Sequence, residues 1–287
     1  MKPRPFKYLA PQSVAEVYQR LAEHGEEPRI LAGGQSLVPM MTLRMAAPEV
    51  LIDINNLDEL SGVSASDDEI RILAMTRHCE VEHSGLVRST LPLLSAAMPH
   101  VAHLAVRNRG TFGGSVSLAD PAAELPACSL LLGASFEIGS TSGTRRVAAA
   151  DFFQGIYETA LAPGDLLLAG IFPRSPASEQ FAFREFSRRK GDFALAGIAA
   201  AGRLDRGELT AIRLVGFGIA DKPVFLHSAG NYALERGGRN IDLAKLKDAV
   251  AANASPAADS HYSAAFRLHL TAILVTRCLA DLTTSER

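Results

Sequence analysis

Apolar residues recur with a helical period close to the start of the chain. The positions that share one face of this predicted helix are Val14, Val17, Tyr18 and Leu21. Ser13 and Glu16 have the spacing of a capping box at its start, and Gly25 is a favoured residue just beyond a helix end. The pattern therefore predicts an amphipathic helix over residues 11–25.

Two short apolar runs follow, and a glycine-containing loop separates them. Arg29–Ala32 and Val50–Ile54 have the length and composition of strands, and residues 37–44 between them resume helical spacing. Pro39 stands where the first turn of a helix tolerates proline. The order strand, helix, strand predicts a βαβ-like unit over residues 1–55.

A second region with a different pattern extends over residues 56–174. Its strands are predicted at 69–74 and 166–172, and a hairpin is predicted from residues 136–138 and 145–147. A short polar helix is predicted at 76–84. An apolar helix is predicted at 91–104, with Pro92 and Pro99 limiting its length.

The third region covers residues 175–287 and begins with a linker-like Ser-Pro-Ala-Ser segment. Strands are predicted at 181–187, 194–202 and 210–219, and helices at 243–252 and 263–282. A run of strands followed by helices favours a small α+β domain with an antiparallel sheet. The whole chain is accordingly placed in the α+β class.

Two glycine pairs with hydroxyl-bearing neighbours are the main chemical feature. Gly33-Gly34 follows the strand at 29–32, and Gly113-Gly114 lies in the segment Thr111–Ser115. Consecutive glycines allow a positive φ and bring backbone N–H groups together into a nest that holds an anion. Two such nests suit the two phosphates of a dinucleotide, although a plain turn is the simpler alternative for each. Neither pair matches the Rossmann fingerprint or the P-loop.

The histidines and cysteines predict no metal site. His78 and His83 are expected at the surface, whereas His100 and His103 are expected to have structural roles. The three cysteines are far apart and are expected to be reduced thiols. They cannot hold a four-cysteine iron–sulfur cluster within one chain.

The composition excludes some classes of function. The chain has 287 residues, with 29 Lys and Arg against 31 Asp and Glu, and this balance gives no nucleic-acid-binding footprint. No apolar run approaches the length of a membrane span, and no signal-peptide pattern opens the sequence. We therefore expect a cytoplasmic protein without a membrane span.

Two long motifs resemble the FAD-binding medium subunit of the molybdenum hydroxylases. This family includes the carbon monoxide and xanthine dehydrogenases. These motifs are AGGQSLVPMMTLR and VRNRGTFGGSVSLADPAAELPA, and the resemblance extends from Phe6 to the C-terminal helix. It implies a two-part FAD-binding domain of the PCMH (vanillyl-alcohol-oxidase-like) type in segments 1–55 and 56–174. Segment 175–287 would then be the C-terminal domain of a medium subunit.

The resemblance also implies a set of cofactor-binding residues. From the first motif these are Leu31, Ala32, Gly33, Gly34, Gln35, Ser36, Leu37 and Val38. From the second motif and beyond they are Val101, Thr111, Gly113, Gly114, Ser115, Glu124, Leu167, Arg184, Asp192 and Phe193.

Several of these residues have simpler alternative roles. Glu124 matches an acidic position beside the ribose end of the cofactor, but it could merely cap a helix. Leu167 and Val101 match positions near the cofactor and are equally suited to a core. Arg184 falls near a cationic position of the family, and Phe193 would gate or stack on the flavin ring. No general base, nucleophile or metal ligand is predicted.

The implied function is electron transfer in a heterotrimer. A large molybdenum-pterin subunit and a small subunit with 2Fe-2S clusters are the implied partners, and a dimer of heterotrimers is the implied assembly. The electron acceptor is left open among NAD, oxygen, quinone and cytochrome. Two alternatives remain at this stage, a self-contained FAD-dependent oxidoreductase of the same superfamily and a non-catalytic flavin-carrying or assembly module.

Overall fold

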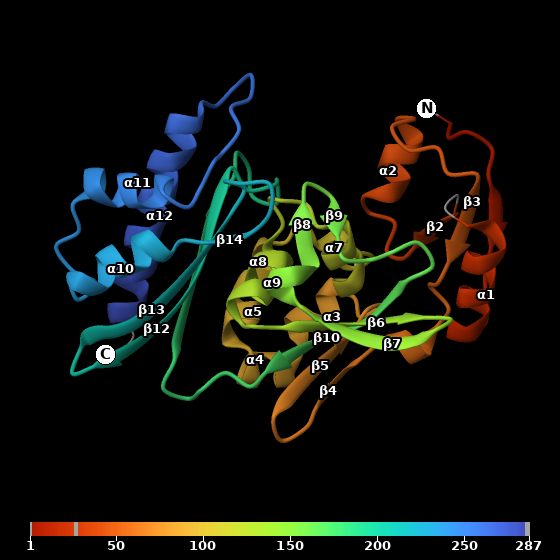
Figure 1. Cartoon of the computed structure of the whole chain (residues 1–287), viewed down its shortest axis with the longest axis horizontal. Coiled ribbons are helices and arrows are strands. Elements are labelled where there is room, and N and C mark those ends of the chain that lie inside the picture. Colours follow the sequence, from red (N-terminus) through yellow and green to blue (C-terminus); the bar gives the residue numbers. More distant parts are fainter. Residues whose placement is uncertain (1, 26–27, 285–287) are drawn as a thin grey trace.

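The computed structural model describes residues 2–25 and 28–284, so the expected domain limits at 1 and 287 lie outside the described residues. Three units follow one another along the longest axis of the molecule, in the order of the chain (Figure 1). The middle unit lies between the other two, and each unit has its own main sheet.

The N-terminal unit is a small parallel sheet with the strand order β1-β3-β2. Its elements are β1 (Lys7–Leu9), α1 (Val14–His24), β2 (Pro28–Leu31), α2 (Leu37–Thr42) and β3 (Val50–Asp53). The Ser13 side chain accepts a hydrogen bond from the Glu16 backbone at 3.2 Å, as the capping pattern predicts. The predicted helix and the βαβ order are confirmed, and β1, only 3 residues long, is an addition to the prediction.

The middle unit is built on an antiparallel sheet with the strand order β4-β5-β10-β6-β7. Its strands are β4 (Val63–Ala65), β5 (Glu69–Leu73), β6 (Ser135–Ser140), β7 (Gly143–Ala148), β8 (Phe153–Gly155), β9 (Glu158–Thr159) and β10 (Leu166–Pro173). Its helices are η1 (Asp58–Leu60), α3 (His78–His83), α4 (Gly85–Thr90), α5 (Pro92–Ala97), η2 (Met98–His100), α6 (Leu104–Arg107), α7 (Phe112–Leu118), α8 (Glu124–Leu131) and α9 (Ala149–Phe152). The predicted hairpin and both strands are confirmed.

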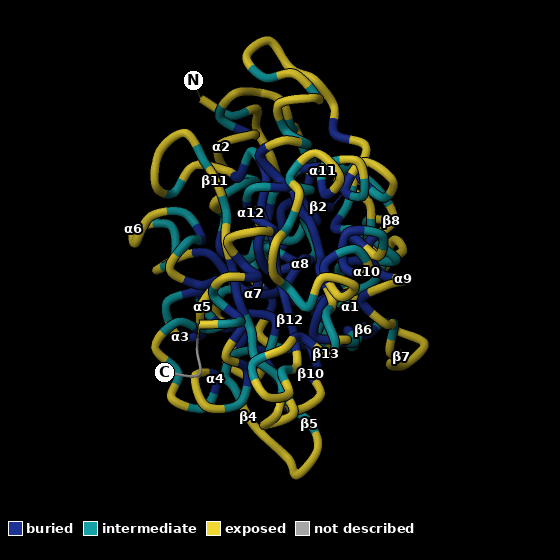
Figure 2. The backbone as a smooth tube through the Cα atoms, turned by 90° about the vertical axis from the view of Figure 1, so that its left-hand side faces the viewer, coloured by how far each residue is buried: buried dark blue, intermediate teal, exposed yellow. Residues whose placement is uncertain are grey.

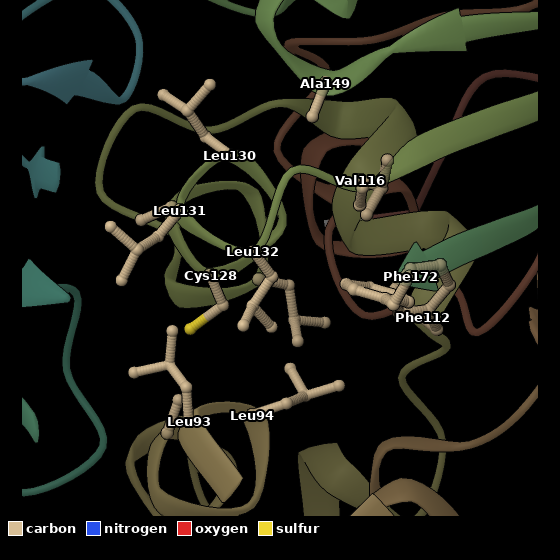
Figure 3. Close-up of a cluster of buried hydrophobic side chains, with 14 of the residues drawn as sticks. Leu93, Leu94, Phe112, Val116, Cys128, Leu130, Leu131, Leu132, Ala149 and Phe172 are labelled. Carbon is tan, nitrogen blue, oxygen red and sulfur yellow. The ribbon is translucent and has the colours of Figure 1, made fainter. Parts of the chain in front are cut away.

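The helices of this unit enclose the largest core of the molecule. Figure 3 shows the side chain of Cys128 on α8 directed toward Leu93 on α5. The rings of Phe112 and Phe172 meet edge to face at 5.9 Å and join α7 to β10. In Figure 2 the buried segments gather inside the molecule, and the loops at its edges are exposed.

The expected helix at 91–104 is divided into two short pieces, α5 and η2, and a non-helical stretch follows before α6 begins at Leu104. Pro92 occupies the first turn of α5 and Pro99 the first turn of η2, so each proline begins a new element. Because proline lacks the N–H that a helix interior requires, the apolar pattern continues while the helix does not.

The C-terminal unit is an antiparallel sheet, β11-β12-β13-β14, with helices on one face. Its elements are β11 (Gln180–Phe186), β12 (Ala196–Asp205), β13 (Glu208–Phe217), β14 (Val224–Phe225), α10 (His227–Glu235), α11 (Leu243–Ala251) and α12 (Ala264–Thr284). The predicted strands and helices are confirmed, and α10 was not predicted. Within the described residues, no helix combines the length and apolarity that crossing a membrane requires.

This sheet separates two hydrophobic cores. Alternate residues of a strand point to opposite faces. On β12, Ala199 and Ala201 join the core of the middle unit, whereas Ile198 and Ala200 join the core under the C-terminal helices. The teal sheet in Figure 1 accordingly stands between α10–α12 and the middle unit. We call the contact of this sheet with the middle unit the seam.

Candidate functional site

A cleft with a volume of about 660 Å³ collects residues from all three units. Gly33–Leu37 line it from the N-terminal unit, and Thr111–Ser115 and Glu124 line it from the middle unit. Gly191–Phe193 of the C-terminal unit complete it. A volume of this size is typical of small-molecule and cofactor sites.

The first glycine loop has the properties of an anion-binding nest. Gly34 has a φ of 73°, the left-handed conformation that glycine adopts without steric cost. In the described part of the chain, the backbone N–H groups of Gly34, Gln35 and Ser36 donate to no protein acceptor. Ser36 precedes α2, and its side chain makes no capping hydrogen bond. These donors are available to an anionic ligand in the cleft.

At position 33 a glycine is needed because the backbone at Arg109 and Gly110 packs directly against it. A Cβ atom at this position would lie 2.3 Å from the carbonyl oxygen of Arg109, so a larger residue would push the two loops apart. The Arg77 guanidinium donates to that same carbonyl and, at 2.8 Å, to the side chain of Asn55. Asn55 donates in turn to the carbonyl of Ala32 at 2.8 Å. This network fixes the first glycine loop against the segment that precedes the second.

The second glycine pair does not form the expected nest. Thr111 is the N-cap of α7, and its side chain accepts the Gly114 N–H at 3.1 Å. The Gly113 N–H donates to the carbonyl of Ala74 at 2.8 Å, and neither glycine has a positive φ. A Cβ atom on Gly113 would lie 2.6 Å from that of Ala74. These glycines permit close packing of α7, and their N–H groups are already used.

His78 lies under this second motif and is buried, contrary to the expectation from the sequence. Its backbone N–H donates to Gly110 at 2.9 Å, and its Nε2 lies 2.8 Å from the carbonyl of Thr111. Because a carbonyl only accepts, Nε2 carries the proton, and Nδ1 is a bare acceptor without a partner among the described residues. Burial lowers the pKa of His78 to about 4, so the imidazole is neutral at pH 7.

The other end of the cleft is acidic. Glu124 at the start of α8 is 6% exposed. Burial, followed by the negative charges of Glu185 and Asp120, raises the pKa of its carboxyl to about 8. Glu124 is therefore mostly protonated at neutral pH. Asp120 accepts hydrogen bonds from the Tyr157 hydroxyl at 3.0 Å and from the Ala122 backbone at 2.8 Å.

The structure brings most of the predicted site residues together in this cleft. Those that line it are Ala32, Gly33, Gly34, Gln35, Ser36, Leu37, Val101, Thr111, Gly113, Gly114, Ser115, Glu124, Leu167, Asp192 and Phe193. Leu31 and Val38 do not line it, but both pack close to Gly34. Phe193 is 62% exposed at the edge.

Arg184 is the predicted residue that the structure directs elsewhere. It lies on β11 and forms a two-pronged ion pair with Asp281 of α12, at 2.6 and 2.7 Å. Successive residues of a strand point to opposite faces, so the neighbouring Glu185 is turned toward the seam instead. Resemblance at a single position could not specify which of the two residues points inward.

Some residues that line the cleft were not among the site residues predicted from the sequence. They include Met40, Met75, His78, Ser117, Asp120, Tyr157, Asp165 and Gly191. Tyr157 has a φ of 57°, which is unusual for a residue with a side chain. His78 directly follows Arg77, a few residues beyond the end of β5, but the sequence carries no sign that it is buried. In the described residues, no group of His, Cys, Asp or Glu has an arrangement that could hold a metal ion.

These features fit FAD. Unpartnered N–H groups at Gly34–Ser36 suit its pyrophosphate, and the apolar side chains of Val101 and Leu167 offer a wall for an aromatic ring. The cleft also offers hydroxyl and carboxyl groups at Ser115 and Glu124, which suit the hydroxyls of a sugar.

Comparison with known families agrees with this fit. A family model described as "FAD binding domain in molybdopterin dehydrogenase" matches residues 4–175. A second, described as "CO dehydrogenase flavoprotein C-terminal domain", matches residues 181–282. The chain belongs to the FAD-binding medium-subunit family of the molybdenum hydroxylases. FAD is thus the cofactor of this chain, and the chain is an oxidoreductase subunit.

Individual relatives match over nearly the whole chain. The 6-hydroxypseudooxynicotine dehydrogenase complex subunit alpha of Paenarthrobacter nicotinovorans is 36% identical, over 98% of this chain and 95% of that protein. The carbon monoxide dehydrogenase medium chain of Afipia carboxidovorans is 32% identical, over 97% of both chains. Among solved structures, carbon monoxide dehydrogenase from Hydrogenophaga pseudoflava superposes with a TM-score of 0.92 at 34% identity and covers 99% of both chains.

Proposed function

We propose that this chain is the subunit through which a heterotrimeric molybdenum hydroxylase passes electrons to an external acceptor. The observation that carries the proposal is the row of N–H groups at Gly34–Ser36 that have no acceptor among the described residues, in a loop that lines the same cleft as the buried carboxyl of Glu124. FAD, when bound, accepts and donates electrons one or two at a time, which suits a link between one-electron clusters and other acceptors.

Individual residues receive the following proposed roles. The backbone of Gly33–Ser36 holds the pyrophosphate, with Leu31 and Val38 bracing the turn at Gly34. Thr111, Gly113, Gly114 and Ser115 form the opposite wall, and Ser115 supplies a hydroxyl. Val101 and Leu167 contact the ring system, Glu124 bonds to the ribose end, and Asp192 and Phe193 control access at the edge.

We further propose that segments 1–55 and 56–174 are the two halves of the FAD-binding domain and that 175–287 is the C-terminal domain. The partners are a large molybdenum-pterin subunit and a small subunit with 2Fe-2S clusters, in a dimer of heterotrimers. Cys79, Cys128 and Cys278 are free, and the latter two are buried. Free thiols fit a reducing compartment, and we propose the cytoplasm.

An absorbance spectrum of the purified chain tests the proposal. We expect a flavin spectrum, and acid denaturation should release FAD into solution, because neither glycine motif contains a residue that could link it covalently. Copurification with two further chains supports the heterotrimer. Bleaching of the bound flavin by an organic substrate, in the absence of other chains, would instead support a self-contained oxidoreductase.

A further inference from the structure

The carbonyl groups of the first glycine loop are held by hydrogen bonds within the protein. The Ala32 carbonyl accepts a hydrogen bond from Nδ2 of Asn55 at 2.8 Å. The Gly33 carbonyl accepts one from Nε2 of Gln35 at 3.1 Å, and the Gly34 carbonyl is used at the start of α2. Three successive carbonyls of this loop therefore have fixed directions.

These contacts also fix the N–H groups of the loop. In a planar trans peptide the carbonyl and the N–H of the next residue point in opposite directions. The carbonyls of residues 32–34 thus determine where the N–H groups of Gly33, Gly34 and Gln35 point. Those N–H groups donate to no acceptor among the described residues, and the same segment lines the cleft. The protein orients these donors before any ligand binds.

Asn55 is placed at the point where the loop begins. It follows β3, whose carboxyl end lies beside that of β2 because Leu31 pairs with Asp53 in the parallel sheet. Its Nδ2 also donates to Oδ1 of Asp53 at 2.5 Å, and its Oδ1 accepts from Arg77 at 2.8 Å. Since every polar atom of the amide has a partner, the amide has one favourable orientation, with Nδ2 toward the Ala32 carbonyl.

The partners of Asn55 are themselves fixed and lie outside the cleft lining. The Tyr8 hydroxyl donates to Asp53 at 2.5 Å. The backbone of Arg77 forms a bridge with Thr111, so its side chain extends from the segment that carries the second motif. Neither Asn55 nor Arg77 is among the residues that line the cleft. Asn55 can therefore act on a ligand only through the loop that it holds.

We propose that Asn55 is a positioning residue for the pyrophosphate of FAD. The inference rests on the proposed function, which places the pyrophosphate at the backbone of Gly33–Ser36. Asn55 holds the Ala32 carbonyl away from the cleft, and the N–H on the other side of that peptide faces the phosphate oxygens. Donors that are oriented in advance need no ordering when the cofactor binds. Without Asn55 the peptide is able to rotate, and a carbonyl oxygen turned into the cleft repels a phosphate.

FAD binding to the flavin-free protein tests this role. The full chain, with any copurifying subunits, is stripped of flavin and titrated with FAD. We expect Asn55→Ala to bind FAD about tenfold more weakly than the wild type, a change of the size expected for one lost hydrogen bond. Phosphorus NMR of the bound cofactor is the second measurement. The phosphorus resonances should move toward those of free FAD, while the absorbance band of the bound flavin stays unchanged.

Asn253→Ala is the matched control for the loss of an asparagine. Asn253 is half-buried like Asn55, and its Oδ1 accepts the Ser228 N–H at 2.8 Å in α10, outside the cleft lining. This variant should keep the wild-type affinity for FAD and the wild-type phosphorus resonances. An equal loss of affinity in both alanine variants would show that general destabilisation governs binding, and the positioning role would be wrong.

Two further variants separate the contacts of the amide. Asn55→Asp keeps an acceptor for Arg77 but lacks the donor to the Ala32 carbonyl, so it should bind FAD no better than Asn55→Ala. Gln35→Met has a side chain of similar length without the donor to the Gly33 carbonyl. It should show the same loss of affinity and the same change in the phosphorus resonances, and it carries the test if Asn55→Ala does not fold.

Three results would overturn the role of Asn55. These are wild-type affinity in Asn55→Ala, wild-type phosphorus resonances in that variant, and restored affinity in Asn55→Asp, which would assign the effect to Arg77. A different result would contradict the proposed function instead. If the phosphorus resonances of FAD do not move when it binds to the wild type, the pyrophosphate does not lie at the first glycine loop, and this is visible before any variant is made.

Discussion

The two glycine motifs share a sequence pattern but have different structures. In both, a Gly-Gly pair stands beside residues with hydroxyl groups. At Gly33-Gly34 the chain turns through a positive φ at Gly34 and leaves the N–H groups of Gly34–Ser36 without an acceptor in the part of the chain that the structure describes. At Gly113-Gly114 the chain enters a helix, and each N–H has a protein acceptor. The first motif therefore keeps donors that a ligand could use, whereas the second uses its donors in packing.

The neighbouring elements cause this difference. The first pair follows the edge of a parallel sheet, where the chain is free to turn toward the cleft. The second pair lies against the end of β5, where Ala74 and Thr76 offer carbonyl oxygens to the N–H groups of Gly113 and Phe112. Substitutions in the first motif should thus affect flavin binding most, and substitutions in the second should affect folding most.

The largest effect on stability is expected for Gly113→Val. The new Cβ atom would lie 2.6 Å from that of Ala74, and the backbone on both sides is fixed by hydrogen bonds. Overpacking of this kind should lower the free energy of unfolding by about 3 kcal/mol, measured by urea denaturation of the flavin-free protein. Gly85→Val is the control. Gly85 also opens a helix but has open space around it, so the change should stay within about 0.5 kcal/mol. Equal losses in the two variants would contradict the packing role.

The pH dependence of stability should be set in part by His78, which anchors the second motif. The pKa of His78 is lowered by burial to about 4, from an ordinary value near 6.5. The folded state favours the neutral imidazole, so the contribution of His78 to the free energy of unfolding is fully present above pH 6.5. It is lost as the pH falls toward 4. Between pH 7 and pH 4.5 the wild type should lose about 2 kcal/mol more than His78→Gln, which has no titratable group there. Urea denaturation at both pH values gives the comparison, and parallel losses would show that His78 does not titrate in this window.

The sequence predicted the elements better than it predicted what the glycines do. Periodicity located α1, β2, β3 and the β6–β7 hairpin because each pattern is local. Whether the N–H groups of a Gly-Gly pair are used within the protein depends on whether a carbonyl such as that of Ala74 lies within reach, and that is a tertiary property. The burial of His78 and the outward turn of Arg184 depend likewise on neighbours far along the chain. Resemblance to a family supplied most of the cleft, since it carries tertiary information that periodicity lacks.

For the first motif, Gly34→Ala should remove flavin at a small cost in stability. A φ of 73° costs a residue with a Cβ about 1–2 kcal/mol, and the added atom would lie 3.2 Å from Val38 and 3.3 Å from Leu31. The N–H groups that face the cleft should shift, and flavin content per chain should fall severalfold in absorbance spectra. Gly133→Ala is the control, because Gly133 has a φ of 65° with open space around it. It should lose similar stability and keep its flavin. Flavin loss in both variants would mean that strain alone, and not the nest, governs binding.

The smallest effect concerns the hydroxyl beside each glycine pair. Thr111 accepts the Gly114 N–H as a helix cap, whereas Ser36 makes no capping bond. Thr111→Ala should therefore lower the free energy of unfolding by up to about 1 kcal/mol, and Thr111→Ser, which keeps the oxygen, should lose less. Ser36→Ala should leave the flavin-free protein within about 0.5 kcal/mol of the wild type and should weaken FAD binding instead. Thermal unfolding with and without FAD separates the two effects, because a ligand stabilises only the form that binds it. If Ser36→Ala destabilised the flavin-free protein as much as Thr111→Ala does, the first motif would be a helix cap like the second, and the contrast between them would disappear.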